Sequence, residues 1–369
     1  MGDWLRRRGP FGALLDRYTR LHSSGRAAMY WALRGLNLDA RTVVWMPAYH
    51  CGVEVQAALD AGLDVGFYRV RPDLAVDLDD LERRLERRPG PVVVVHYFGF
   101  GQPRIAAIDE LCRRRQCLWL EDCAHALFSD HEGAALGTFA PLSIFSLRKT
   151  LPLFEGGALQ FNPERVCATD RELRSPRRFP LSSAPLRFYA IETARQMIGD
   201  RPFSWYRRAR GREVAEPTEW TDAFQERHRY PHALAAISYR MAASFDPESV
   251  AERRRANWRA LDRQLEGTPG YCAVFDRLPA GVCPLFLPIR VSNRRAVMEA
   301  LRGQGVETFA FGACRHPRLN AAEFQDADCL RNEIVCLPVH QGLTAARVEH
   351  IAAAARPLVA KYGIDAPSA

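Results

Sequence analysis

The sequence contains almost no lysine. Of its 51 basic residues all but two are arginine, and the two lysines are Lys149 and Lys361. Because arginine stays protonated and cannot act as a neutral amine, a lysine inside such a chain suggests a task that a permanent cation cannot perform. Lys361 lies close to the end of the sequence and needs no such explanation. Lys149 is therefore the first candidate functional residue.

Other features are missing as well. No stretch of 18 or more apolar residues exists, which excludes a helix that spans a membrane. The first residues, MGDWLRRRGP, are basic but lack a continuous apolar segment, so we expect no secretory signal. The ten cysteines are scattered, without a CxxC pair or any paired metal-ligand spacing. We therefore expect reduced thiols, a cytoplasmic location and no metal site.

The chain carries a modest excess of positive charge, with 43 acidic residues and a formal net charge of +8. Its arginines stand in short doublets and triplets beside acidic residues, without a recognition helix, an RNA-binding signature or a zinc finger. This distribution is typical of solvated helix faces, so we expect no nucleic-acid partner. The content of 47% hydrophobic and 25% charged residues is that of an ordinary globular protein.

Short apolar runs alternate with helical stretches over residues 26–162. The near-continuous valines indicate strands that are covered on both faces. The alternation predicts an α/β fold with a mostly parallel sheet flanked by helices, and such sheets bind ligands beyond the carboxyl ends of their strands. We expect strands at 43–46, 64–70, 91–98, 117–122, 143–146 and 158–161, and helices at 27–36, 54–62, 77–88 and 107–115.

The rest of the chain is organised differently. Residues 163–225 are rich in arginine, aromatic residues and proline, which suggests a long excursion. We expect the later elements to be a helical region at 231–266 with a long connecting helix that ends at Gly267, a strand at 283–291, a helix at 294–305 and a final helix near 344–361. This pattern predicts a large domain over 1–245, including the excursion, and a smaller C-terminal α/β domain over 246–369.

Two predicted strands are followed by residues that can carry chemistry. A partly desolvated lysine near another cation can lose its proton and attack a carbonyl, and Lys149 comes directly after a strand; a surface lysine in a loop is the alternative. Asp122 ends the apolar segment CLWLED, where a carboxylate can hold a cationic ring nitrogen or cap the next helix. His125 can lie beside the same ligand or be a structural histidine.

A third feature is the small-residue turn Ser23-Ser24-Gly25, which opens an apolar helix. Backbone amides at such a helix start form a natural phosphate site. An anion cradle, a carboxylate at a strand end and an amine in a later loop are together what pyridoxal phosphate requires. Its phosphate, its pyridinium nitrogen and its aldehyde carbon each need one partner.

The sequence resembles the DegT/DnrJ/StrS family of sugar aminotransferases, which are pyridoxal phosphate enzymes of fold type I. That fold has a large domain with a mostly parallel sheet flanked by helices, and a smaller C-terminal α/β domain. The similar segments run in family order over most of the chain: SSGRAAMYWALRGL, MPAYHCGVEVQAALDAG, HYFGFGQP, EDCAHA, FSLRKTLPLFEGGAL and VCLPVHQGLT.

This resemblance implies a role for several residues. Lys149 becomes the lysine that holds the cofactor as an internal aldimine and later shuttles protons. Asp122 becomes the partner that keeps the pyridinium nitrogen protonated, and His125 takes a position near the ring. Ser146 matches the family serine that contacts the phosphate.

The resemblance is less complete elsewhere. Gly25 with Arg26 matches the backbone phosphate loop, but the family usually has Thr or Ser where Arg26 stands. A guanidinium can bind the phosphate in its own fork geometry or point elsewhere. The aromatic ring that stacks on the cofactor is expected near Cys51, and here the candidates shift to His50 or Tyr49.

As a member of this family the protein would move an amino group, by resemblance from glutamate, to a keto group of a nucleotide-linked sugar or a cyclitol. The family builds its site across a homodimer, although the N-Y-R-M segment that reaches the neighbouring subunit is poorly matched around residues 227–230. The alternatives are another pyridoxal phosphate reaction, such as an elimination or a condensation, and a non-catalytic protein that binds the cofactor. The family's dehydratases have histidine in place of the lysine, so Lys149 argues against them.

Overall fold

The structure is a computed structural model that describes residues 19–162, 165, 186–191, 220 and 227–364. The excursion predicted at 163–225 therefore lies almost wholly outside the described residues. Among the helices that are described, none is both long enough and apolar enough to cross a membrane.

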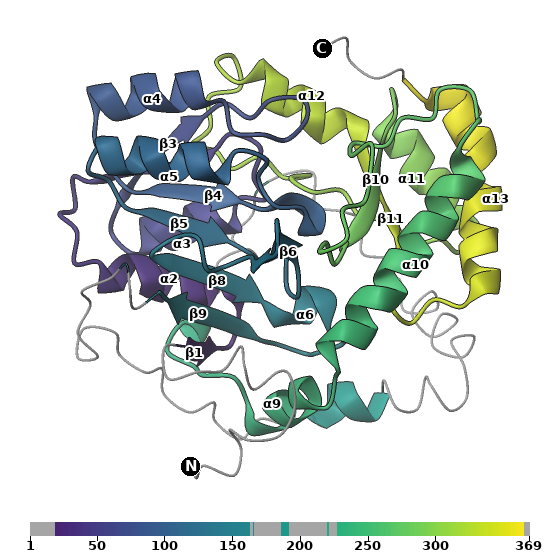
Figure 1. The fold of residues 1–369 in the computed structure, drawn as a ribbon, viewed down its shortest axis with the longest axis horizontal. Coiled ribbons are helices and arrows are strands. Elements are labelled where there is room, and N and C mark those ends of the chain that lie inside the picture. The colour runs from purple at the N-terminus through teal and green to yellow at the C-terminus, as the bar shows by residue number, and fades with distance from the viewer. Residues whose placement is uncertain (1–18, 163–164, 166–185, 192–219, 221–226, 365–369) are drawn as a thin grey trace.

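A seven-stranded sheet forms the centre of the first part of the chain (Figure 1). Its strands stand in the order β1-β9-β8-β5-β4-β2-β3. The neighbours from β3 to β8 pair in parallel, whereas β9 runs antiparallel to both β8 and β1. The strands are β1 (Thr19–His22), β2 (Val43–Pro47), β3 (Asp64–Tyr68), β4 (Val92–Val95), β5 (Trp119–Asp122), β8 (Leu142–Ser146) and β9 (Gly157–Phe161). The predicted mostly parallel sheet is confirmed.

Helices cover both faces of this sheet. Figure 1 shows α4 and α5 along one face and α2 with α3 on the other, as right-handed crossovers require when the strand order reverses after β3. Both faces of the inner strands are therefore buried, which explains why β4 is four consecutive valines. The helices are α2 (Gly25–Gly35), α3 (Val53–Asp60), α4 (Leu78–Arg87) and α5 (Ile105–Arg114).

Several short elements complete this part of the fold. They are η2 (Tyr97–Gly99), β6 (Asp130–His131), β7 (Ala134–Ala135) and α6 (Leu147–Thr150). The strand predicted at 91–98 ends at Val95, because the chain turns there and Phe98 adopts a left-handed conformation with φ of 56°. Strand β1, whose sequence TRLH lacks apolar alternation, was not predicted, and neither was the β6–β7 hairpin.

The C-terminal part contains a second, two-stranded sheet in which β10 and β11 are antiparallel. The elements of this C-terminal part are η4 (Arg227–Arg229), α9 (Ala236–Ala243), α10 (Pro247–Leu265), β10 (Phe286–Arg290), α11 (Arg294–Gly303), α12 (Gln325–Glu333), β11 (Ile334–Pro338) and α13 (Ala345–Tyr362). A long helix is found where the connecting helix was predicted, since α10 ends at Leu265, while α12 and β11 were not predicted. The helical region breaks before α10 because Asp246 caps its first turn and Pro247 begins it.

One hydrophobic core extends from the seven-stranded sheet into the C-terminal part. Figure 1 shows α10 running from the sheet to β10, β11 and α13. The division into domains over 1–245 and 246–369 stays a prediction.

Candidate active site

Two parallel neighbours, β5 and β8, end at the same edge of the large sheet. β5 ends at Asp122, which pairs with Ile144, and β8 ends two residues further on at Ser146. The short helix α6 follows at once and carries Lys149. The strand ends thus bring the predicted carboxylate and the predicted amine to the edge where parallel sheets bind ligands.

Asp122 is a buried carboxyl group. Its Oδ1 accepts a hydrogen bond from the amide of Ala124 at 2.9 Å, and this contact belongs to a turn rather than to a helix cap. Burial raises the pKa of Asp122 to about 6; the negative charge of Glu54 adds to the increase and the positive charge of Lys149 opposes it. A carboxyl group in these surroundings is stabilised as the anion by a cationic partner, and a protonated ring nitrogen is such a partner.

Lys149 is half-buried and has titratable neighbours. Its positive charge acts to lower the pKa of Asp122, of Cys51 and of His125, so its amine lies within electrostatic range of all three groups. The residue sits in the single turn of α6 rather than in the loop that the sequence suggested. The alternative of a freely exposed surface lysine is therefore not what the structure shows.

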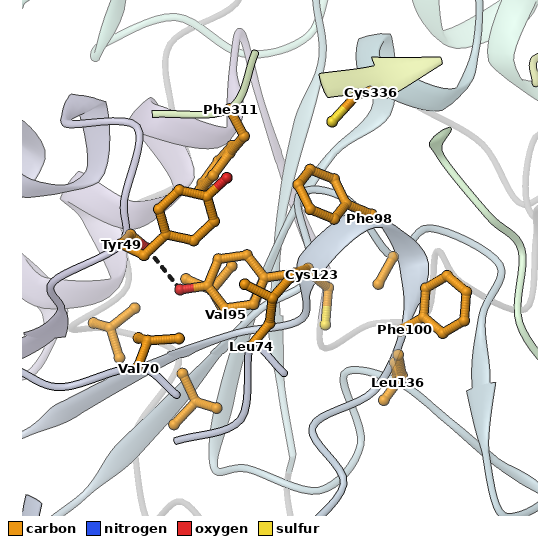
Figure 2. Close-up of a cluster of buried hydrophobic side chains, with 14 of the residues drawn as sticks. Tyr49, Val70, Leu74, Val95, Phe98, Phe100, Cys123, Leu136, Phe311 and Cys336 are labelled. Carbon is orange, nitrogen blue, oxygen red and sulfur yellow. Dashed lines mark hydrogen bonds between the residues drawn. The ribbon is translucent and has the colours of Figure 1, made fainter. Parts of the chain in front are cut away.

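His125 is buried in an aromatic cluster. Its ring stacks on Phe98 with 5.6 Å between the ring centroids and meets Phe311 edge-on at 4.9 Å. The Phe98 amide donates to its Nδ1 at 3.3 Å, which leaves the proton of the neutral ring on Nε2. Burial, with a smaller effect from Lys149, holds the pKa of His125 well below its usual value. Figure 2 shows Phe98 and Phe311 gathered with Tyr49.

The start of α2 lies against the last residue of β8 and the first residue of β9. A β-carbon on Gly25 would lie 3.2 Å from the β-carbon of Ser146, and one on Gly157 would lie 2.1 Å from the main-chain oxygen of Ser24. Glycine at both positions lets the end of the helix approach the sheet edge. Because the first amides of a helix have no intrahelical acceptor and its dipole attracts anions, the start of α2 at Gly25, beside the buried Ser146, is the candidate anion cradle of this edge.

The structure shows other contacts for three predicted cofactor-binding candidates. His50 is buried; its ring stacks on Phe67 of β3 at 5.1 Å and its Nδ1 lies 3.0 Å from the oxygen of Pro47. Tyr49 packs in the aromatic cluster, with its ring 5.1 Å from that of Phe311. Arg26 is half-buried, and its charge acts to lower the pKa of Tyr230. The roles of these three residues toward a cofactor stay predictions.

Sequence reasoning missed Glu54 and the part played by Cys51. Glu54 is buried in the first turn of α3 and accepts hydrogen bonds from the Cys51 amide at 3.0 Å and from its thiol at 2.7 Å. The charge of Glu54 raises the pKa of Asp122, and the charge of Lys149 acts to lower the pKa of Cys51. The pair of Glu54 and Cys51 therefore borders the site. The available signal was Glu54 itself, one of two carboxylates in the mostly apolar stretch GVEVQAALDAG.

Glu121, which precedes Asp122 in the segment EDCAHA, has a structural role. Its two carboxylate oxygens accept four hydrogen bonds, from His96 and from the amides of Gly137, Phe139 and Ala140. Ligand atoms of His96, Glu121 and Cys123 lie close enough to share a metal ion. However, His96 accepts from an amide at Nδ1, so its Nε2 carries the proton and donates to Glu121. This group does not offer a metal the lone pairs it needs.

The strand order, with an antiparallel β9 between β8 and β1, and the edge that gathers a carboxylate, an amine and an anion cradle define the fold type I class of pyridoxal phosphate transferases. Comparison with protein families makes the assignment specific. The model of the DegT/DnrJ/EryC1/StrS aminotransferase family matches residues 16–179 and 208–356. The chain belongs to this family, as its motifs predicted.

Relatives with established names match the chain over different lengths. A UDP-4-amino-4,6-dideoxy-N-acetyl-beta-L-altrosamine transaminase of Campylobacter jejuni is 31% identical over 158 residues, which is 42% of either chain and so less than half of that relative. A dTDP-4-dehydro-2,3,6-trideoxy-D-glucose 4-aminotransferase of Saccharopolyspora spinosa is 25% identical over 338 residues, 89% of this chain and 81% of the relative. An L-glutamine:2-deoxy-scyllo-inosose aminotransferase of Streptomyces kanamyceticus is 29% identical over 139 residues, 37% and 32% of the two chains.

Solved structures share the fold at low sequence identity. The aminotransferase TlmJ of Streptoalloteichus hindustanus superposes with a TM-score of 0.66 and 22% identity, over 93% of this chain and 86% of that one. The PMP-form of Spr1654 from Streptococcus pneumoniae, described as a candidate sugar aminotransferase, gives a TM-score of 0.66 and 15% identity over the same shares. These likenesses confirm the predicted fold.

Proposed function

We propose that the protein is a pyridoxal phosphate-dependent aminotransferase that transfers an amino group to a keto group of a sugar or a cyclitol. The arrangement at one sheet edge carries this proposal: Asp122 ends β5, Lys149 follows β8, and Gly25 opens α2 against Ser146. Membership of an aminotransferase family supports the same reaction.

The residues at this edge fit the cofactor. Gly25 lets the start of α2 approach Ser146, so that the first amides of the helix lie beside this serine, and Asp122 is a buried carboxyl group whose pKa is raised although the charge of Lys149 opposes the increase. When bound, pyridoxal phosphate supplies an aldehyde that reacts with amines and a ring that takes up the electrons of the bond broken beside the amine. The chain supplies binding, orientation and proton transfer.

Each residue has its own task in this proposal. The amine of Lys149 would hold the aldehyde carbon of the cofactor and would be the group that moves a proton to or from the substrate carbon. Asp122 holds the ring nitrogen protonated, and Ser146 with the first amides of α2 binds the phosphate. The neutral His125 lies within electrostatic range of Lys149 and would lie beside the cofactor, with its ring held against Phe98.

The names of the relatives support the substrate class. They describe transfer to nucleotide-linked keto sugars and, in one case, to a cyclitol with glutamine as the donor. We therefore propose glutamate, or its amide, as the donor and a nucleotide-linked keto sugar or a keto cyclitol as the acceptor. A homodimer and a cytoplasmic location are further predictions of the same proposal.

The proposal is tested with purified protein and added cofactor. We expect a yellow protein whose colour borohydride fixes, with the added mass on the peptide that contains Lys149 and none on the peptide that contains Lys361. Glutamate or glutamine should then convert the visible band and yield 2-oxoglutarate or its amide, and a panel of keto sugars and keto cyclitols should restore the band. Colour without this conversion would favour elimination or condensation chemistry, and a protein that stays colourless would overturn the proposal.

A further inference from the structure

Arg254 is the most deeply buried cation of the connecting helix α10. Its relative exposure is 2%, whereas the neighbouring Arg253 is exposed. No carboxylate within the described part of the chain forms an ion pair with it, and burial lowers the pKa of its guanidinium to about 10, so it remains charged at neutral pH. A buried charge without a counter-ion is costly unless hydrogen bonds satisfy it, so the acceptors of Arg254 indicate why it is there.

The guanidinium donates in three directions at once. Its Nε donates to the side-chain oxygen of Gln341 at 2.8 Å and its Nη2 to the main-chain oxygen of Thr150 at 2.9 Å. Its Nη1 donates to the main-chain oxygens of Pro284 and Leu285 at 3.1 and 3.2 Å. Only the planar fork of an arginine can serve acceptors in these separate directions.

Gln341 closes a triangle with these groups. Its Nε2 donates to the same Thr150 oxygen at 3.0 Å, so that one carbonyl accepts from both Arg254 and Gln341. The two donors come from different elements, α10 and the loop before α13. The position of the Thr150 carbonyl is therefore set from outside α6.

Thr150 is the residue after Lys149 and the last residue of α6. A helix of four residues is too short to be stable by itself. At its first residue the Leu147 amide donates to the oxygen of Gly156 at 3.0 Å, and at its last residue the carbonyl is held by Arg254 and Gln341. The peptide that carries Lys149 is thus fixed at both ends.

We propose that Arg254, together with Gln341, is a positioning residue that sets where the amine of Lys149 lies, in addition to tying α10 to the sheet. This inference rests on the proposed role of Lys149. Attack on a bound aldehyde requires the amine at a defined distance and angle, and a displacement of about 1 Å can cost on the order of a hundredfold in rate.

Gln341→Glu separates positioning from simple attachment. A glutamate at this position still accepts from Arg254 Nε and gives the buried cation a counter-ion, so attachment of α10 is kept or strengthened. Its second oxygen would replace the donor to Thr150 with an acceptor and repel that carbonyl. Arg254→Lys keeps the charge but supplies one nitrogen in place of the fork, and Arg253→Lys is the matched control, because Arg253 donates to the main-chain oxygen of Gln341 and not to Thr150.

Three quantities are measured for each variant loaded with pyridoxal phosphate: total bound cofactor by equilibrium dialysis, the fraction fixed on Lys149 by a short borohydride pulse, and the thermal midpoint. We expect Gln341→Glu and Arg254→Lys to bind the cofactor within about threefold of the parent but to lower the fixed fraction about fivefold to tenfold. The pH at which the visible band titrates should also shift in these two variants. Arg253→Lys should match the parent in every measurement.

An unchanged fixed fraction and an unchanged pH titration in Gln341→Glu would overturn the inference, whatever happens to the thermal midpoint. If Arg254→Lys fails to fold, the result for Gln341→Glu decides the question by itself. Failure of the proposed function is recognised separately, because the unaltered protein would then yield no borohydride adduct on Lys149.

Discussion

Gly157, the first residue of β9, lies so close to Ser24, the cap of α2, that a β-carbon on it would be 2.1 Å from the Ser24 oxygen. The Gly156 amide also donates to the oxygen of Ser23 at 2.9 Å. The two glycines of the segment Glu155-Gly156-Gly157 therefore act on the anion cradle, 133 residues away in the chain, by allowing β9 to contact the start of α2.

Gly157→Ala should weaken cofactor binding, because either β9 or the start of α2 must move to make room for the methyl group. We expect the dissociation constant for pyridoxal phosphate to rise about tenfold, the value of one favourable anion contact at a helix start. Equilibrium dialysis measures it. The control is Gly303→Ala, where an added β-carbon meets nothing within 4 Å; equal affinities of the two variants would contradict the expectation.

Lys149→Arg should abolish transamination while keeping the positive charge at this position. Arginine cannot lose its proton to become the attacking amine, so we expect at least about a thousandfold loss of activity. Mass spectrometry after borohydride should find no adduct. Lys361→Arg, which alters the only other lysine of the sequence, should retain both the adduct and the activity.

The cofactor-free protein should lose stability as the pH rises through about 6. The pKa of Asp122 is raised from its ordinary 3.8 to about 6 in the folded chain, so between these values the folded state binds the proton more tightly than the unfolded state does. The free energy of unfolding then falls with rising pH, by about 1–2 kcal/mol between pH 5 and 8 for this one group. Urea unfolding at pH 5 and pH 8 measures this change in the free energy of unfolding of the parent. The change should disappear in Asp122→Asn.

Glu54→Gln should lower the pKa of Asp122, because the charge of Glu54 contributes to its increase. The loss of stability that Asp122 causes should therefore be smaller and should end at a lower pH in this variant, because it begins at the pKa of the unfolded chain, which does not change. Glutamine keeps an oxygen that can accept from the Cys51 amide, so the local fold is preserved. Glu299→Gln, on the exposed face of α11, is the control; the same pH profile in both variants would show that Glu54 has no electrostatic effect on the site.

The sequence predicted the centre of the fold well, because buried parallel strands have a distinct composition. Runs such as the valines of β4 indicate strands covered on both faces, and Asp122 marked the end of β5 because it follows the apolar residues of CLWLED. The edge strand β1 was not recognised because it is half-exposed and its four residues lack a repeating pattern. Its place beside β9 depends on contacts that are distant in sequence.

The candidate site could be predicted only in outline. Local sequence indicated Lys149 and Asp122, but the direction of a side chain in a loop depends on tertiary packing. The ring of His50 stacks on Phe67, whereas the charge of Lys149 acts to lower the pKa of the neighbouring Cys51. In the same way the run Arg253 to Arg255 gave no indication that the middle residue would be the buried one, because that depends on how α10 is rotated against the sheet.

The hydrogen bonds of Arg254 have a consequence for how related sequences can diverge. Three of its four acceptors are main-chain oxygens, those of Thr150, Pro284 and Leu285. Every residue type offers such an oxygen, so these three positions are free to change their side chains without breaking the contact. Selection on this contact would act on two side chains, and Arg254 and Gln341 would be retained while the residues around them are replaced.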